Sequence, residues 1–263
     1  MENSEGFVVY YEGNVMDYKE DLSKIISLIN NLNREIQEYN FRLTRGMCIE
    51  KFGNSMYSYL ENALDDIDSY RYDYIRLREI ELLIDEIKYK KLRGAIAEVG
   101  VYRGEISAFL NKLLPEKKIY LFDTFAGFTD KLLSENTAHE YTNNSFFQSI
   151  KKFANTSESV IFQKMSTPEN CIICKGVFPQ TALNINEDFC FVSIDVDFYA
   201  STLEALKYFY PKLLHGGYLF IHDYNDDELR GVKEAVYKYQ DDINEELHSV
   251  PLCDHSGTLV ITK

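Results

Sequence analysis

The segment from Ala95 to Gly104 constrains the fold of this chain more than any other part of the sequence. It begins as a short apolar run, which is typical of a buried parallel strand, and it breaks at two glycines. A helical pattern from Glu105 to Leu114 follows. A strand, a glycine turn and a helix in this order build the ligand crevice of an open α/β sheet. Glycine lets the backbone approach a ligand closely, and the helix N-terminus presents free N–H groups.

The residues around this turn favour a cationic nucleoside over a dinucleotide. A dinucleotide fold requires Gly-x-Gly-x-x-Gly, whereas this chain has Glu98-x-Gly100-x-x-x-Gly104. A carboxylate before the first glycine suits a positively charged ligand better than a phosphate. The next apolar run, 118–122, ends in Asp123, where an acid is placed to bind the two hydroxyls of a ribose. S-adenosylmethionine fits this description; the alternative is a sheet whose loop glycine only turns the chain.

The composition excludes several classes of partner. With 42 acidic and 28 basic side chains the chain carries a net charge of −14, which repels nucleic acid and anionic lipid. We therefore expect no nucleic-acid partner and no membrane partner. The N-terminus lacks the basic start and apolar core of a signal peptide, and the five cysteines are an odd number, so we expect a reduced, cytoplasmic protein. Cys171 and Cys174 are three residues apart on a predicted strand and face opposite sides, which argues against a metal or redox pair.

The sequence divides into an N-terminal helical extension, residues 1–73, and a second domain, residues 74–263. Apolar residues recur at helical spacing in 17–40, and this helix could cover the active site, form a homodimer or pack on the core. A less regular helical pattern spans 42–66. An amphipathic helix from residue 74 to about 91 carries Arg76, which either reaches the ligand crevice or forms a surface ion pair.

Alternating strands and helices in the second domain predict a doubly wound, mostly parallel seven-stranded sheet of the α/β class. The long polar stretch from 131 to 144, with His139 and Glu140, reads as a lid or substrate loop. The predicted strands are 95–99, 118–122, 171–176, 189–194, 218–221, 247–252 and 258–261, the last two forming a terminal hairpin. The predicted helices between them are 105–114, 145–153, 157–165, 204–214 and 231–239, with Gly216 and Gly217 closing the fourth.

Acidic residues follow two neighbouring strands at the same edge as the glycine turn. Asp195 and Asp197 follow one strand, and His222 and Asp223 follow the next. Such a cluster repels itself, and a hard divalent cation such as magnesium relieves that cost. We expect Asp195 and Asp223 to bind the metal, with His222 as a third ligand, and Asp197 to act as general base. The alternative is that these acids only cap helices.

Five segments carry a resemblance to a known family, and they occur in the order Glu-Val-Gly-Val-Tyr-Arg-Gly (98–104), Phe-Asp-Thr-Phe-Ala-Gly-Phe (122–128), Lys-Gly-Val-Phe-Pro (175–179), Asp-Val-Asp-Phe-Tyr-Ala-Ser-Thr (195–202) and Gly-Gly-Tyr-Leu-Phe-Ile-His-Asp-Tyr (216–224). From about Tyr74 to its C-terminus the chain resembles the macrocin O-methyltransferase family, bacterial enzymes that methylate sugar hydroxyls on macrolide and aminocoumarin antibiotics. The resemblance implies a class I, Rossmann-like methyltransferase that uses S-adenosylmethionine and magnesium. It also implies metal binding at Asp195, His222 and Asp223 and a base at Asp197.

The chain departs from the antibiotic-tailoring members at His222, where they carry an acid. Imidazole is a poorer ligand for magnesium, so a weaker or different metal is expected, or more waters around Asp195 and Asp223. The His-Asp-Tyr sequence is similar to relatives associated with surface-glycan genes, which shifts the expected acceptor toward a glycan or nucleotide sugar. The expected cofactor-binding residues are Glu98, Gly100, Tyr102, Gly104, Ser107, Asp123, Thr124, Gly176 and Asp195.

Three other functions compete with a metal-assisted sugar O-methyltransferase. The same scaffold could methylate a carboxylate or an amine without a metal. It could also be a non-catalytic module that binds a glycan or a protein through its N-terminal helices. A nicotinamide oxidoreductase is disfavoured because the third glycine that holds a phosphate is missing.

Overall fold

The computed structural model of the chain describes residues 22–29, 31–32, 74–128, 133, 153–254 and 256–263. The chain divides into two compact units, 1–74 and 75–263. In the first unit, the described residues 22–29 and 31–32 are helical, within the predicted helix 17–40. Three predicted features lie outside the described residues: the helix 42–66, the loop 131–144 with His139 and Glu140, and residues 145–152 of the helix 145–153.

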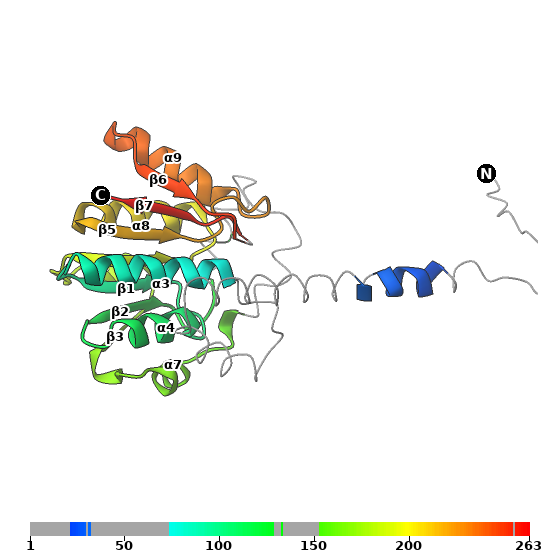
Figure 1. Ribbon diagram of the computed structural model, residues 1–263, viewed down its shortest axis with the longest axis horizontal. Coiled ribbons are helices and arrows are strands. Elements are labelled where there is room, and N and C mark those ends of the chain that lie inside the picture. The colour runs from blue at the N-terminus through cyan, green and yellow to red at the C-terminus, as the bar shows by residue number, and fades with distance from the viewer. Residues whose placement is uncertain (1–21, 30, 33–73, 129–132, 134–152, 255) are drawn as a thin grey trace, which may run out of the picture. The chain divides into compact units, whose positions relative to one another are not determined.

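The remaining described residues form a sheet with helices on its two faces (Figure 1). The strands are β1 (Ala95–Val99), β2 (Ile119–Asp123), β3 (Cys171–Lys175), β4 (Phe189–Ile194), β5 (Leu213–Ile221), β6 (His248–Pro251) and β7 (Leu259–Thr262). The helices are α3 (Tyr74–Tyr89), α4 (Glu105–Leu113), α7 (Glu158–Lys164), α8 (Tyr199–Lys212) and α9 (Gly231–Ile243), with 3₁₀ turns η3 (Pro168–Asn170) and η4 (Gln180–Ala182). None of the described helices is both long and apolar enough to cross a membrane.

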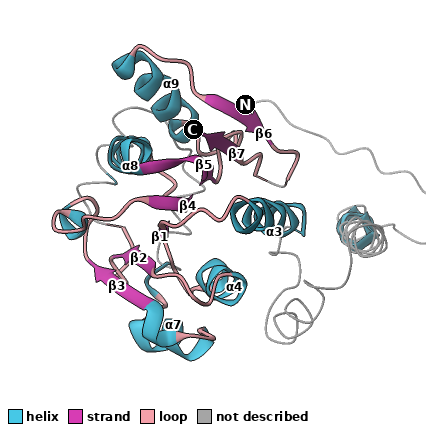
Figure 2. Cartoon of the chain, turned by 60° about the vertical axis from the view of Figure 1, so that its left-hand side comes forward, coloured by secondary structure: helices cyan, strands magenta, loops and turns pink. Residues whose placement is uncertain are grey.

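The seven strands lie in the order β3-β2-β1-β4-β5-β7-β6. Strands β1 to β5 are parallel, and β7 runs antiparallel to both β5 and β6. Figure 2 shows α8 and α9 on one face of the sheet and α3 and α4 on the other. The predicted doubly wound sheet with an edge hairpin is confirmed. The direction of winding reverses between β1 and β4, and ligands of such sheets bind at this switch point.

The apolar sequences of the central strands follow from the two helical layers. Every residue of β1 and of β4 is buried, because both faces of these strands are covered. On one face α3 contributes Leu77, Ile80, Ile84 and Ile87, which recur at helical spacing and are at most 2% exposed. The core therefore holds the central strands in a fixed register, since a slip of one residue would turn Glu98 of β1 to the opposite face.

The connection into β5 differs from the prediction. The helix was expected to span 204–214 and to end at two glycines, but α8 begins at Tyr199 and β5 begins at Leu213. Leu213 pairs with Phe189 of β4, and the register then shifts before the next pair. Gly216 lies in this irregular part at φ +82°, and its N–H donates to the Lys263 carbonyl at 2.7 Å. The glycine thus forms a bulge within the strand.

Backbone hydrogen bonds continue beyond the strands and fix the first loop residues. The Asp195 N–H donates to the Val99 carbonyl at 2.8 Å, across from β4 to β1. The His222 N–H donates to the Ile194 carbonyl at 3.0 Å, across from β5 to β4. The sheet ladder therefore extends to the residues that leave it, and their side chains emerge from adjacent, rigidly spaced positions.

At this edge of the sheet, the backbone of Gly100 lies very close to the backbone of Asp195. Its φ of +86° lies in the left-handed region, and a Cβ built on it would lie 1.8 Å from the Asp195 carbonyl oxygen. The loop after β1 and the loop after β4 therefore touch through their backbones, and only glycine fits between them.

We predict that Gly100→Ala destabilises the protein far more than Gly216→Ala. Both glycines have similar φ values, but a Cβ on Gly216 meets only side chains at ordinary contact distance, the nearest being Lys90 at 3.4 Å and Leu92 at 3.8 Å. Gly216→Ala should lower the unfolding free energy by about 1–2 kcal/mol, the cost of the left-handed conformation. Gly100→Ala adds a backbone clash and should cost more than about 3 kcal/mol in total. Denaturant unfolding of the two variants measures the difference; equal losses would contradict the close approach.

Candidate active site

A pocket of about 450 Å³ lies at the carboxyl ends of β1, β2, β3 and β4. This volume is in the range of small-molecule sites, which is about 300–1,000 Å³. Its lining includes the loops after these strands and the first turn of α8. The residues are Val99, Gly100, Tyr102, Phe122, Asp123, Thr124, Gly127, Phe128, Phe153, Gly176, Val177, Phe178, Pro179, Gln180, Asp195, Val196, Asp197, Ala200, Ser201 and Glu204.

The pocket gathers six of the nine predicted cofactor-binding residues, Gly100, Tyr102, Asp123, Thr124, Gly176 and Asp195. The other three, Glu98, Gly104 and Ser107, are not part of its lining. Gly104 instead packs beneath α7, where an added Cβ would lie 2.8 Å from the Ile161 side chain. Glu98, Gly104 and Ser107 thus belong to the unit of β1, the glycine turn and α4, but they lie outside the pocket surface.

Asp123, the predicted ribose ligand, also holds the glycine turn in place. Its Oδ2 accepts hydrogen bonds from the N–H groups of Val101, at 2.9 Å, and Tyr102, at 2.8 Å. Its Oδ1 accepts one from the Phe125 N–H at 2.7 Å. A carboxylate has about four acceptor sites, two on each oxygen. Among the described contacts, one site on Oδ1 is left for a ligand hydroxyl.

Glu98 is a buried carboxyl group behind the pocket. Its side chain accepts a hydrogen bond from the Ser107 hydroxyl, and the residue is 2% exposed. Burial raises the pKa of Glu98 to about 8, and the negative charge of Asp195 adds to the rise. A cationic ligand nearby would stabilise the ionised form of Glu98. This agrees with the sequence analysis, in which a carboxylate before the first glycine suits a positively charged ligand.

One wall of the pocket is aromatic, and the sequence reasoning did not identify it. Phe153 packs edge-on against Tyr102, with ring centroids 5.3 Å apart, and against Phe128 at 5.5 Å. Phe128 in turn lies 4.5 Å from Phe198. Flat apolar surfaces of this kind suit a nucleobase. Phe128 belongs to the segment 122–128 that carries the resemblance, so its place after Asp123 was the available signal.

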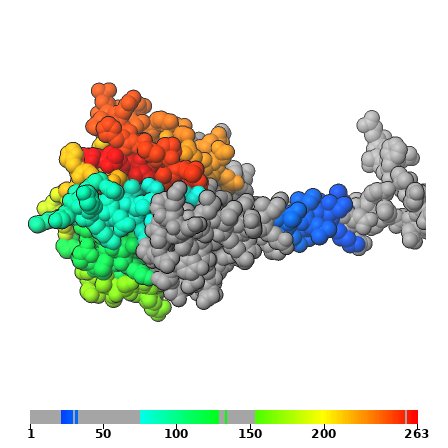
Figure 3. All heavy atoms as spheres, viewed as in Figure 1, coloured from blue at the N-terminus to red at the C-terminus, as the bar shows by residue number. Residues whose placement is uncertain are grey.

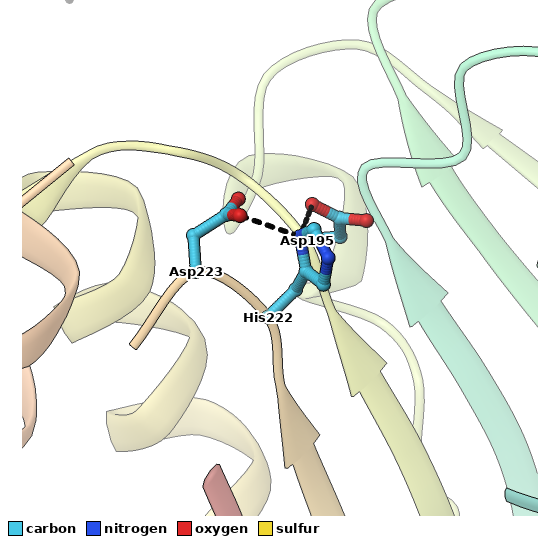
Figure 4. A group of neighbouring side chains, drawn as sticks. All are labelled: Asp195, His222 and Asp223. Atoms are coloured by element: carbon cyan, nitrogen blue, oxygen red, sulfur yellow. Dashed lines mark ion pairs between the residues drawn. The ribbon is translucent and has the colours of Figure 1, made fainter. Parts of the chain in front are cut away.

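The three predicted metal ligands converge beside the pocket (Figure 4). Asp195 follows β4, and His222 and Asp223 follow β5. His222 Nδ1 lies 3.1 Å from Asp195 Oδ1 and 2.8 Å from Asp223 Oδ1. All three ligand atoms lie within 4.8 Å of one another.

This donor set fits a divalent cation. Ligand atoms at about 2.1 Å from an ion and at right angles to each other lie about 3 Å apart, close to the two distances here. Both contacts of His222 are ion-pair contacts, and its buried Nδ1 makes no hydrogen bond of regular geometry among the described residues. Burial alone lowers the pKa of His222, but the charges of Asp195 and Asp223 raise it to about 10. Positive charge is thus stabilised at this position.

Arg76 of α3 contacts this cluster through Asp195. Its guanidinium donates to Asp195 Oδ2 at 2.9 Å, while Oδ1 of the same carboxylate faces His222. Of the two roles left open for Arg76, the structure shows that it reaches the ligand crevice: its ion pair is made with Asp195, which lines the pocket, and not with a surface residue. Burial raises the pKa of Asp195, but the charges of His222 and Arg76 lower it well below its usual range. Asp195 is therefore ionised and held in one orientation.

Asp197, the predicted general base, lines the pocket next to Asp195. Its φ of +59° is unusual for a residue other than glycine, and the Phe198 N–H donates to the Val196 carbonyl at 2.6 Å across it. This tight turn directs the chain from β4 into α8. Burial, followed by the charges of Asp223 and Asp195, raises the pKa of Asp197 well above its usual value. A carboxylate with a raised pKa is a stronger proton acceptor than an ordinary aspartate.

Cys171 and Cys174 on β3 are both free and partly buried. Burial raises the pKa of the Cys171 thiol to about 11, so this thiol is protonated at neutral pH. A thiol must lose its proton to bind a metal or attack a disulfide, and the surroundings of Cys171 oppose that loss.

Comparisons with known proteins agree with this geometry. The family model described as macrocin-O-methyltransferase (TylF) matches residues 72–257. Mycinamicin III 3''-O-methyltransferase of Micromonospora griseorubida is 25% identical over 179 residues, which cover 63% of this chain and 68% of the relative.

Two solved structures share the fold. The O-methyltransferase NovP superposes with a TM-score of 0.59 at 20% identity, over 72% of this chain and 79% of NovP. The calicheamicin methyltransferase CalS11 superposes with a TM-score of 0.54 at 18% identity, over 87% of this chain and 92% of CalS11. Because the family match spans well over half of the sequence and the pocket lies at the switch point of the same sheet, the chain belongs to the macrocin O-methyltransferase family and is an S-adenosylmethionine-dependent methyltransferase.

Proposed function

We propose that this enzyme transfers the methyl group of S-adenosylmethionine to a sugar hydroxyl, assisted by a divalent cation that Asp195, His222 and Asp223 hold. The acceptor is a glycan, a nucleotide sugar or a glycosylated natural product. The observation that carries the proposal is the convergence of these three ligand atoms beside a pocket that Asp195 and Asp197 line. The name of the mycinamicin relative, a 3''-O-methyltransferase, supports a hydroxyl acceptor.

In this proposal, different residues bind different parts of the cofactor. Asp123 accepts a hydrogen bond from a ribose hydroxyl through its remaining site on Oδ1. The aromatic wall formed by Tyr102, Phe128 and Phe153 packs against the adenine ring. Glu98, behind the glycine turn, stabilises the positive charge of the methionine part. Asp195 and Asp197, which line the same pocket, would then lie where the acceptor hydroxyl meets the methyl group.

The acids of the site then prepare the acceptor. A divalent cation held by Asp195, His222 and Asp223 would lower the pKa of a sugar hydroxyl bound beside it. The Asp197 carboxylate accepts the proton of that hydroxyl. The oxygen forms a bond to the methyl carbon as the bond from this carbon to sulfur breaks, and S-adenosylhomocysteine leaves as a neutral thioether. Arg76 keeps Asp195 directed toward His222 throughout.

We predict that Asp223→Asn separates catalysis from cofactor binding. Asp223 is 5% exposed and is not part of the pocket lining, so S-adenosylmethionine affinity should be unchanged in calorimetry. Asparagine tolerates the φ of +58° at this position, which limits structural damage. Magnesium affinity should fall at least about 10- to 100-fold, the loss that follows even from changes in residues that only hold the metal ligands in place. Asp227→Asn, an exposed acid four residues further along the chain, is the matched control.

Methyl transfer to a sugar acceptor should also stop when a chelator removes divalent ions, and it should return when magnesium is added. Full activity in the chelator would contradict the metal-assisted mechanism and would favour methylation of a carboxylate or an amine, which needs no cation.

We predict that Asp197→Asn lowers kcat for methyl transfer by about 10²- to 10⁴-fold, the range of general base catalysis. Asparagine keeps the size of the side chain and suits the left-handed backbone, but it cannot accept the proton. Binding of S-adenosylhomocysteine and of magnesium should persist in this variant. Wild-type turnover in Asp197→Asn would remove this residue from the mechanism.

A further inference from the structure

The described N-terminal residues form a helix with a broad apolar face. Residues 22–29 and 31–32 are helical, and their large apolar side chains are 51–67% exposed. Figure 3 shows the atoms of this segment in blue. We define the apolar stripe as Leu22, Ile25, Ile26, Leu28, Ile29 and Leu32.

The two faces of this helix are cleanly separated. At about 100° per residue the apolar stripe covers about 160° of the helix circumference. The described polar residues Ser23, Lys24, Ser27 and Asn31 lie together on the opposite side. A helix with so wide an apolar face is stable in water only when another surface covers that face.

The spacing of the apolar residues indicates what kind of surface covers the apolar face of this helix. Leu22, Ile25, Ile29 and Leu32 are separated by three, four and three residues. In the printed sequence the same alternation runs without interruption from Val15 to Leu43 and includes Tyr18, Ile36 and Tyr39. A mean spacing of 3.5 residues is the signature of helices that pack along their length against other helices of the same kind.

The apolar stripe lies before the residues that the family model matches, which begin at residue 72. The pocket and the cluster of Asp195, His222 and Asp223 are built from residues after 75. The stripe therefore contributes no residue to the pocket or to this cluster.

We propose that copies of this chain associate through the apolar stripe as a helical bundle. Every copy carries the same stripe, so one repeated sequence supplies both sides of the interface. Ile26 and Leu28 flank the seam and widen it, which suits a bundle with a broad apolar interior. This proposal does not depend on the metal or on the acceptor.

Sedimentation equilibrium of the full-length protein tests the proposal. The wild type should sediment as a multiple of the single-chain mass of 30.7 kDa. Ile25→Glu/Ile29→Glu places two charges in the seam, and this variant should sediment as a single chain. Ser23→Glu/Ser27→Glu adds the same charge to the polar face and should remain associated like the wild type. S-adenosylmethionine affinity should be equal in all three proteins, because the substituted residues are not among those that line the pocket.

Two results would overturn this inference. A wild type that sediments as a single chain at every concentration would mean that the chain covers the stripe itself. A seam variant that stays as associated as the wild type would mean that another surface joins the copies. Retention of S-adenosylmethionine binding in the seam variant distinguishes loss of association from loss of folding.

Discussion

The parallel hydrogen bonding of β1, β4 and β5 is the constraint on which the site depends. Val99 pairs with Ile194, and Ile194 pairs with Ile221, so the three strands end at the same level. The ladder then continues into Asp195 and His222 through the bonds that their N–H groups donate. Because the central strands are buried on both faces, their register cannot change without loss of the core. The convergence of Asp195, His222 and Asp223 is thus a consequence of how the sheet ends.

Charge balance is the second requirement of this edge. Asp195, Asp197 and Asp223 lie close together in a chain that already carries a net charge of −14. Arg76 offsets part of this repulsion, and the raised pKa values of Asp197 and His222 are its signs. His222 releases its proton when its Nδ1 binds a metal. Both pKa shifts indicate that the carboxylates of the site carry more negative charge than Arg76 alone can balance. A bound divalent cation would reduce the repulsion among these carboxylates.

Much of this arrangement could be predicted from the sequence, because parallel strands impose simple rules. The apolar runs before Gly100, Asp123 and Asp195 predicted buried strands, and the carboxyl ends of parallel strands share one edge. The pairing of Arg76 with Asp195 could not be chosen over a surface ion pair, since the two are 119 residues apart in sequence. The position of Glu98 behind the pocket could not be predicted either. Both faces of β1 are buried, so the sequence pattern does not show which face lies toward a ligand.

Local signals failed where tertiary pairing overrode them. Gly216 and Gly217 read as the end of a helix, but pairing of Leu213 with Phe189 extends the strand back through both. The aromatic wall was missed because Phe153 is distant in sequence from Tyr102 and Phe128, and only the fold brings the three together.

The central claim is that Asp195, His222 and Asp223 hold a cation beside the methyl donor. A crystal grown with S-adenosylhomocysteine and manganese, examined by anomalous scattering, measures this directly. We predict an anomalous peak within bonding distance of all three side chains while the cofactor product occupies the pocket. An occupied pocket with no peak at this position, or a peak bound by other residues, would contradict the account.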